Sequence, residues 1–222
     1  MKVRAVFGLI RLGMATLCAV ALVHRLAWGL SSHTIAGENF FAYLTVQSNC
    51  AFAVLLLIAG IVAFRRDRDP RWLTIALALT LTWTITCGIA FALIVWQAGL
   101  RGIRIDVPWS DQLLHFWLPG LAVAGWTLAP GHLRVPWWVV PVAPIYPLLW
   151  GLGAMWRGPQ VGWDPYYFLD LRQVELPEFL VSATVALALF ALVGTAIVLI
   201  SRTQLRFDPL RFRLGRREHL QR

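Results

Sequence analysis

The sequence predicts an all-α polytopic membrane protein, a bundle of six transmembrane helices with both termini on the cytoplasmic side (N-in/C-in). Of its 222 residues, 59% are hydrophobic and only 14% are charged, and the mean hydropathy is +0.66. A helix needs about 20 apolar residues to cross a bilayer, and this chain contains several such runs. The runs are continuous rather than alternating, which favours helices over a membrane barrel.

Six stretches meet the length requirement and are predicted to be the transmembrane helices. The first could be mistaken for a signal peptide cleaved near Ala21, but its apolar run continues to Trp28, and we expect an uncleaved helix. Residues 1–205 are expected to form one transmembrane domain, followed by a basic cytoplasmic tail, residues 206–222. The six stretches are residues 6–28, 40–64, 72–98, 111–128, 137–155 and 178–200.

The basic residues predict the orientation of the bundle. The net charge is +9, and with the N-terminus inside, the inner segments hold 15 of the 20 basic residues, including seven arginines from Arg202 to Arg222. This matches the positive-inside rule. The tail is expected to bind anionic lipid rather than nucleic acid. Arginine outnumbers lysine 19 to 1, which suggests a GC-rich bacterial genome and predicts a bacterial cytoplasmic membrane.

Two segments have more than one interpretation. The fifth stretch contains Pro136, Pro141, Pro144 and Pro147, which remove backbone donors. It is either a bent packing helix or a broken one that exposes carbonyls to the protein interior. The longest outer loop, residues 156–177, is rich in aromatic residues that form either an interfacial belt or a cap over a cavity.

Two polar residues lie inside apolar stretches and point to chemistry. Thr45 is five residues past Phe40, and His115 is four past Asp111. At 1.5 Å per residue, both lie roughly 6–8 Å below the start of their helices. In the predicted topology both helices run inward from the outer side. A hydroxyl and an imidazole can therefore meet there if these two helices pack together.

Helical spacing adds candidate partners to this pair. The Asp111 carboxylate, four residues before His115, could orient the imidazole as a base that activates the Thr45 hydroxyl. Gln47, Ser48 and Asn49 could donate hydrogen bonds to an oxyanion. The alternative is structural, because Ser, Thr and Asn in membrane helices often bond between helices, and His115 could do the same.

Short motifs at these positions carry a family resemblance. They are Tyr43-Leu-Thr45, Leu114-His115 with Pro119, and Trp163-Asp-Pro-Tyr-Tyr-Phe-Leu169. With the six apolar segments, over roughly residues 5–200, the chain resembles the androgen-induced protein family of integral membrane threonine hydrolases. The resemblance implies that Thr45 is the nucleophile and His115 the catalytic histidine.

Characterised animal members of that family cleave fatty acid esters of hydroxy fatty acids. The spacing of 70 residues between Thr45 and His115 looks shorter than in the animal proteins. In a bacterial chain the animal substrate need not be retained. The resemblance supports the type of reaction better than it supports the ester that is cleaved.

The leading expectation is an intramembrane lipid ester hydrolase that needs no metal or other cofactor. Its partners would be the lipid bilayer and a membrane lipid or fatty acid ester. A lipid-binding or transport protein without chemistry is the first alternative, since a broken helix can line a transport site. A haem protein with His24 and His115 as axial ligands is a weaker one. A metalloenzyme has the least support because no paired-ligand spacing occurs. The oligomeric state is left open.

Overall fold

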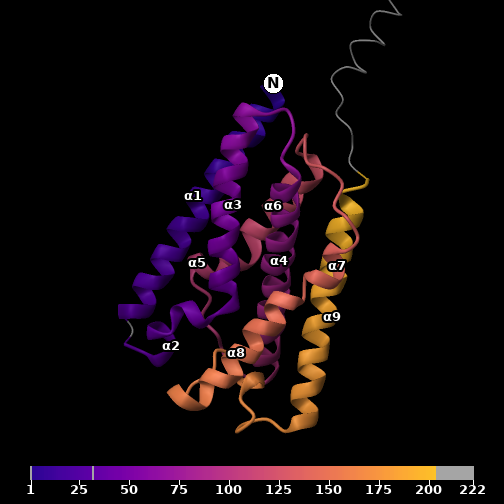
Figure 1. The fold of residues 1–222 in the computed structure, drawn as a ribbon. Helices are drawn as coiled ribbons and strands as arrows, with labels where there is room; N and C mark the ends of the chain where they lie inside the picture. Colours follow the sequence, from indigo (N-terminus) through magenta and orange to yellow (C-terminus); the bar gives the residue numbers. More distant parts are fainter. Residues whose placement is uncertain (1, 32, 204–222) are drawn as a thin grey trace, which may run out of the picture.

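The structure, a computed structural model, describes residues 2–31 and 33–203, and every regular element within these ranges is helical (Figure 1). The chain begins with α1 (Lys2–Ser31) and ends with α9 (Leu176–Ile200). Between them lie α2 (Ile35–Glu38), the 3-10 turn η1 (Phe40–Ala42), α3 (Leu44–Arg65), α4 (Arg71–Leu100), α5 (Trp109–Gln112), the π turn η2 (Leu113–Trp117), α6 (Leu118–Leu128), α7 (Val139–Val142), α8 (Ile145–Val161) and the 3-10 turn η3 (Tyr167–Leu169).

The described residues contain five helices, not six, that are long and apolar enough to cross a membrane. The expected fourth span forms a continuous helical segment from Trp109 to Leu128, but its polar residues and aromatics make it too weakly apolar to qualify. Seven helices rather than six therefore follow one another in the described residues. They are the five spans, of which one comprises α7 and α8, together with the Trp109–Leu128 segment and the unexpected α2. The five spans are Val3–Ser31, Leu44–Arg65, Arg71–Leu100, Val139–Val161 and Leu176–Ile200. They indicate an integral membrane protein.

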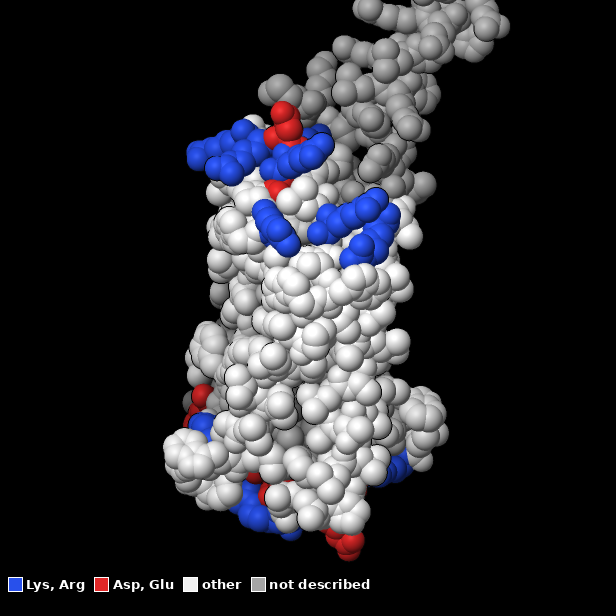
Figure 2. All heavy atoms as spheres, turned by 45° about the vertical axis from the view of Figure 1, so that its right-hand side comes forward, with Lys and Arg blue, Asp and Glu red and all other residues white. Residues whose placement is uncertain are grey.

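Both described ends of the chain lie at the same end of the bundle (Figure 1). On the face drawn in Figure 2, arginines gather at that end, and a broad uncharged belt separates them from charges of both signs at the other end. The expected tail, residues 206–222, lies outside the described residues. Exposed arginines of the first end include Arg65, Arg66, Arg68, Arg71 and Arg134.

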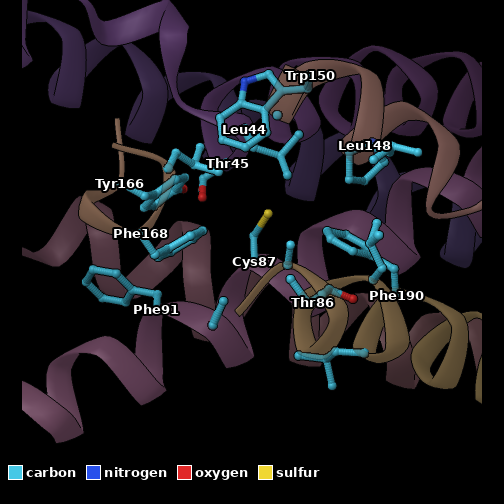
Figure 3. Close-up of a pocket in the computed structure, with 18 of the residues that line it drawn as sticks. Leu44, Thr45, Thr86, Cys87, Phe91, Leu148, Trp150, Tyr166, Phe168 and Phe190 are labelled. Atoms are coloured by element: carbon cyan, nitrogen blue, oxygen red, sulfur yellow. The ribbon is translucent and has the colours of Figure 1, made fainter. Parts of the chain in front are cut away.

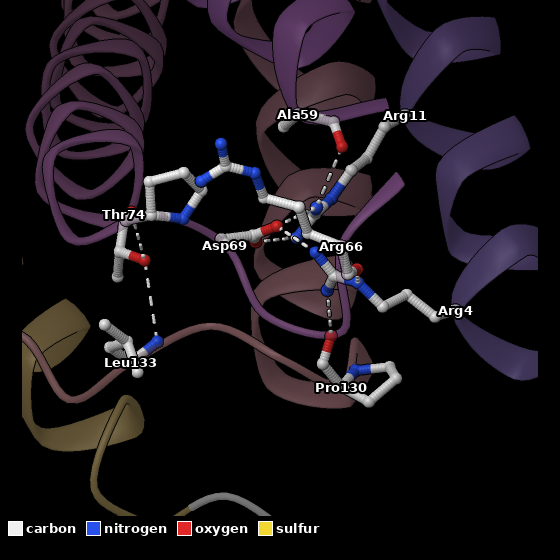
Figure 4. Close-up of polar contacts among 9 residues, drawn as sticks. Arg4, Arg11, Ala59, Arg66, Asp69, Thr74, Pro130 and Leu133 are labelled. Carbon is white, nitrogen blue, oxygen red and sulfur yellow. Dashed lines mark hydrogen bonds and ion pairs between the residues drawn. The ribbon is translucent and has the colours of Figure 1, made fainter. Parts of the chain in front are cut away.

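A buried ion cluster ties three distant segments together at the arginine-rich end (Figure 4). Arg4 and Arg11 of α1 both bind the Asp69 carboxylate, at 2.5 Å and 2.9 Å. Arg4 also donates to the carbonyls of Arg66 and Pro130, at 2.6 Å and 2.8 Å. A buried carboxylate needs such compensation, so the cluster fixes α1 against the loop between α3 and α4.

The helix of the proline-rich stretch is interrupted, and the carbonyl that this frees accepts a hydrogen bond from another helix. The helix is interrupted between α7 and α8, at Ala143 and Pro144. Pro147 has no N–H to donate to the Ala143 carbonyl, four residues earlier. The indole of Trp83 on α4 donates to that carbonyl instead, at 2.8 Å. Of the two interpretations of this stretch, the interruption and the use of the freed carbonyl favour the broken helix.

The arrangement of α3 and the Trp109–Leu128 segment sets the site. The two run in the same direction through the bundle (Figure 1), and α3 contacts η2 directly. Helix α4 packs against η2 as well. The two helices that carry Thr45 and His115 therefore do meet, as the sequence required for a shared site.

Candidate functional site

Two cavities meet at the residues that the sequence singled out. The first, of about 150 Å³, is lined almost entirely by apolar side chains (Figure 3). The second, of about 390 Å³, is larger and includes the charged side chains of Arg25 and Asp111. The wall that the two cavities share is formed by Thr45, Phe91, Ile94, His115 and Tyr166. Thr45 and His115 thus lie together at the junction of an apolar cavity and a more polar one.

Thr45 is the second residue of α3 and is buried. The first intrahelical bond runs from Gln47 N–H to the Tyr43 carbonyl, at 3.2 Å, and Tyr43 makes no side-chain cap. The backbone N–H groups of the first turn, which include that of Thr45 itself, precede the regular ladder. The positive end of the α3 dipole therefore lies beside the Thr45 hydroxyl.

The Thr45 hydroxyl has two polar neighbours across the cavity wall. Tyr166 lines both cavities together with Thr45, and Cys87 lines the apolar cavity. Figure 3 shows Tyr166 beside Thr45 and the Cys87 sulfur pointing toward the same space. Within the described residues, no hydrogen bond joins Thr45 directly to His115. The two side chains line both cavities.

His115 lies in the π turn η2, where the helical ladder is interrupted. Pro119 cannot donate to the His115 carbonyl, and Leu118 donates instead to Leu113, five residues earlier. The His115 carbonyl faces Gly88 of α4, where a Cβ would overlap its oxygen. Pro119 and Gly88 together explain the local geometry, and π turns occur often at functional sites.

The imidazole of His115 is oriented by backbone and by packing. Its Nδ1 atom bonds to the backbone carbonyl of Asp111, at 2.9 Å. The ring stacks on Phe91, with centroids 4.0 Å apart and planes 18° apart. This corrects the expectation that the Asp111 carboxylate orients the ring, because that carboxylate pairs with Arg25 Nε, at 3.0 Å.

The three expected oxyanion donors are used elsewhere. Gln47 donates to the Phe41 carbonyl, at 2.8 Å, and accepts a bond from the Tyr146 hydroxyl. Ser48 and Asn49 both donate to the Thr45 carbonyl, at 3.1 Å and 2.9 Å. None of the three lines either cavity. They therefore hold the first turns of α3, which is the structural role that short polar residues often take in helices.

The loop between α8 and α9 forms a cap. Tyr166, Phe168 and Leu169 line the apolar cavity, and Tyr166 contacts Tyr43 edge-on, with ring centroids 6.0 Å apart. Of the two interpretations of this loop, these contacts favour the cap. Burial raises the pKa of the Tyr166 phenol above its usual range, so this hydroxyl remains a donor at neutral pH.

Arg172 forms ion pairs with two carboxylates within the cap. Its guanidinium binds the Asp170 carboxylate, with Nε at 2.6 Å, and reaches Asp164, at 3.1 Å. The hydrogen bonds from Arg172 hold the pKa of Asp170 well below its usual range. The cap is therefore stabilised by the ion pairs of Arg172 and by the aromatic contacts of Tyr166.

The ligand pairs needed by the other expectations are not brought together. His24 is exposed, packs against the Trp109 ring at 4.5 Å and lines neither cavity. His115 lines both cavities, so the two histidines expected as axial ligands line no common cavity. In the described part of the chain no group of three or more His, Cys, Asp or Glu side chains could hold a metal ion.

Several residues of the site were not predicted from the sequence. Phe91 and Cys87 are apolar or weakly polar residues in a long apolar run, and nothing in that run marks them. Tyr166 lay within a motif that carried the family resemblance, but without an assigned role. Pro119 offered a usable signal, because a proline four residues after a histidine leaves the histidine carbonyl without its donor.

Searches of family models, curated proteins and solved structures gave no match for this chain.

Proposed function

We propose that this protein is an intramembrane lipid ester hydrolase in which Thr45 is the nucleophile and His115 the base. The observation that carries the proposal is that Thr45 and His115 both line the wall shared by the two cavities. A hydroxyl and an imidazole lie at the junction of two cavities, one almost entirely apolar and one that also contains the charged side chains of Arg25 and Asp111. An ester with two unlike halves would fit across such a junction, with its carbonyl at the level of Thr45.

The reaction follows from the chemistry of these groups. His115 Nε2 takes the proton of the Thr45 hydroxyl as Oγ attacks the ester carbonyl carbon. The protonated imidazole then donates to the departing alkoxide, which leaves as an alcohol. An acyl–Thr45 ester remains, and water activated by the same nitrogen cleaves it to release the carboxylic acid. The Nδ1 bond to the Asp111 carbonyl keeps Nε2 unprotonated before the reaction.

The oxyanion would be stabilised by groups other than those expected from the sequence. The uncapped N–H groups in the first turn of α3 lie beside Thr45, and a helix N-terminus favours negative charge. The Tyr166 phenol, which lies beside Thr45 and lines the same two cavities (Figure 3), is a second donor. Donors of this kind supply a large part of the rate enhancement in acyl transfer.

The proposal includes the family and the orientation inferred from sequence. The chain would be a bacterial member of the androgen-induced protein family, with substrates among fatty acid esters of hydroxy fatty acids or related lipids. The arginine-rich end would face the cytoplasm, in an N-in/C-in topology. The site end would then lie in the outer leaflet, and substrate would enter laterally from the bilayer. The protein would act in lipid metabolism at the bacterial cytoplasmic membrane.

The test is hydrolysis by purified protein in detergent, with a fluorophosphonate probe as an independent reporter of an activated hydroxyl. Thr45→Ala should abolish both labelling and hydrolysis of a fatty acyl ester. Thr80→Ala is the matched control, because Thr80 is a buried threonine of α4 that bonds to its own helix, at 3.0 Å, and lines neither cavity. Full hydrolysis by Thr45→Ala would overturn the mechanism.

A lipid-binding protein without chemistry is the second candidate. The observation in its favour is the lack, within the described residues, of a direct hydrogen bond between Thr45 and His115. Catalytic hydrogen bonds are often longer in an unliganded site and tighten in the substrate complex. Saturable lipid binding with no turnover, by wild-type protein and by Thr45→Ala alike, would identify the binding function instead.

A further inference from the structure

The larger cavity contains a cation that the proposed hydrolysis does not use. This cavity, of about 390 Å³, is lined by Arg25, Trp28, Tyr43 and Asp111, among others. Arg25 is a residue of α1, far in sequence from both Thr45 and His115. Basic residues within membrane segments are rare and usually face a functional cavity or a partner.

The Arg25 guanidinium is held in place but only partly paired. Its Nε atom pairs with Asp111 Oδ1, at 3.0 Å, and its carbon lies 4.3 Å from the centroid of the Trp28 ring. Its Nη1 atom is buried and has no hydrogen-bond partner among the described residues. A guanidinium carries five donors in a rigid plane, and leaving a buried donor unpaired is unfavourable.

The missing partner is best supplied by an anion. A planar guanidinium binds carboxylate and phosphate oxygens through two parallel hydrogen bonds. Tyr43, which also lines this cavity, carries a hydroxyl that can serve as a second donor. Because Asp111 already offsets one positive charge, the fit to an oxyanion depends on directed donors more than on net charge.

We propose that Arg25 binds the anionic group, a carboxylate or a phosphate, of an amphiphile that occupies the larger cavity. The apolar part of the same molecule extends past Thr45 and His115 toward the apolar cavity. If the bound molecule is the substrate, the hydrolysed ester carries an anionic group, and this part of the proposal rests on the proposed function. The binding of an anionic amphiphile by Arg25 does not depend on hydrolysis.

The experiment measures binding to full-length protein in nonionic detergent, followed by tryptophan fluorescence because Trp28 lies in the cavity. The probes are dodecanoate, dodecyl phosphate and the uncharged methyl dodecanoate, each corrected for partition into protein-free micelles. Wild-type protein should bind at least one anionic probe about tenfold or more tightly than the methyl ester. The ratio between dodecanoate and dodecyl phosphate tells which anion the site prefers.

Variants assign the effect to Arg25. Arg25→Gln should abolish the preference for the anionic probes, and Arg25→Lys should keep only part of it, because an ammonium group lacks the planar pair of donors. Arg101→Gln is the control, since Arg101 is exposed and lines neither cavity. An undiminished preference in Arg25→Gln would overturn the proposal.

Two outcomes separate this proposal from the proposed function. Thr45→Ala should still bind dodecanoate like wild type, even with hydrolysis abolished. Wild-type protein that hydrolyses esters but binds dodecanoate and its methyl ester equally would refute the anion site and leave the hydrolase standing. This equality would count against the anion site even if the Arg25 variants failed to fold.

Discussion

The Nδ1 atom of His115 donates to the backbone carbonyl of Asp111 across 2.9 Å, while the Asp111 carboxylate pairs with Arg25 at 3.0 Å. A carbonyl can only accept a hydrogen bond, so the proton of the neutral ring is on Nδ1 and Nε2 is the basic nitrogen. The tautomer that a base requires is therefore set by the helix backbone, and the carboxylate of the same residue has a different partner.

Asp111→Asn should therefore lower the activity only modestly. We expect ester hydrolysis to stay within about tenfold of wild type, whereas loss of a carboxylate that orients a catalytic histidine costs about 10⁴ in kcat. His115→Gln, the comparison variant, should lose about a thousandfold or more. Initial rates normalised to folded protein in detergent check this, and a thousandfold loss in Asp111→Asn would show that the carboxylate is the orienter.

Gly88→Ala should disturb the π turn that carries His115. A Cβ at residue 88 would overlap the His115 carbonyl oxygen, so α4 and η2 must separate, at a typical cost of about 1–3 kcal/mol. We expect hydrolysis to fall about tenfold or more. Gly99→Ala in the same helix has open space around its Cβ and should be neutral or slightly stabilising. Equal rates and equal Tm values for both variants would contradict the tight contact.

Trp83→Phe should destabilise the break between α7 and α8. The substitution keeps an aromatic ring but removes the donor to the Ala143 carbonyl, which then lacks a partner, at a cost of about 1–3 kcal/mol. Trp156→Phe is the control, because Trp156 is 73% exposed. Thermal unfolding in detergent compares the two, and a smaller loss for Trp83→Phe than for Trp156→Phe would argue against the role of this bond.

His132 should make the arginine-rich end sensitive to acid. Burial lowers the pKa of His132 from 6.5 to about 4, with Arg11 acting in the same direction. The folded-state pKa lies below the unfolded one, so protonation opposes folding. The contribution is complete above about pH 6.5 and is lost as the pH falls toward 4, by up to about 3 kcal/mol.

The measurement is Tm against pH for wild type and for His132→Gln. Carboxylates titrate in both proteins, so their effects cancel in the difference between the two curves. The wild type should lose more stability than the variant between pH 7 and pH 4.5. Parallel curves over this range would mean that His132 is not held neutral by burial.

The fold was largely predictable because long apolar runs of sequence are the main signal for membrane-spanning helices. Five of the six expected stretches coincide with helices that can cross a membrane. The exception, residues 111–128, contains the site, and its polar and aromatic residues are the reason that its apolar signal is weak. The prolines of the fifth stretch predicted a break, but only the structure shows Trp83 as the donor that meets the exposed carbonyl.

The candidate site was predictable in part for a related reason. Thr45 and His115 stand out because polar groups are costly in an apolar helix, and helix rise predicted them at a similar depth. Their partners could not be found this way. Asp111 contributes its backbone to His115, Arg25 comes from another helix, and Phe91 resembles any other apolar residue of α4. Contacts of this kind depend on packing across helices, which spacing along one helix does not encode.

The Arg4–Asp69–Arg11 cluster has a consequence for how the chain is assembled. Asp69 lies in the loop between α3 and α4, and two arginines from α1 compensate its buried charge. A hairpin of α3 and α4 inserted in the opposite direction would carry Asp69 to the far side of the bilayer, away from both arginines. Breaking a buried pair of this kind costs about 3–5 kcal/mol. The cluster therefore stabilises the arrangement in which Asp69 lies at the same end of the bundle as Arg4 and Arg11 over an arrangement with this hairpin reversed.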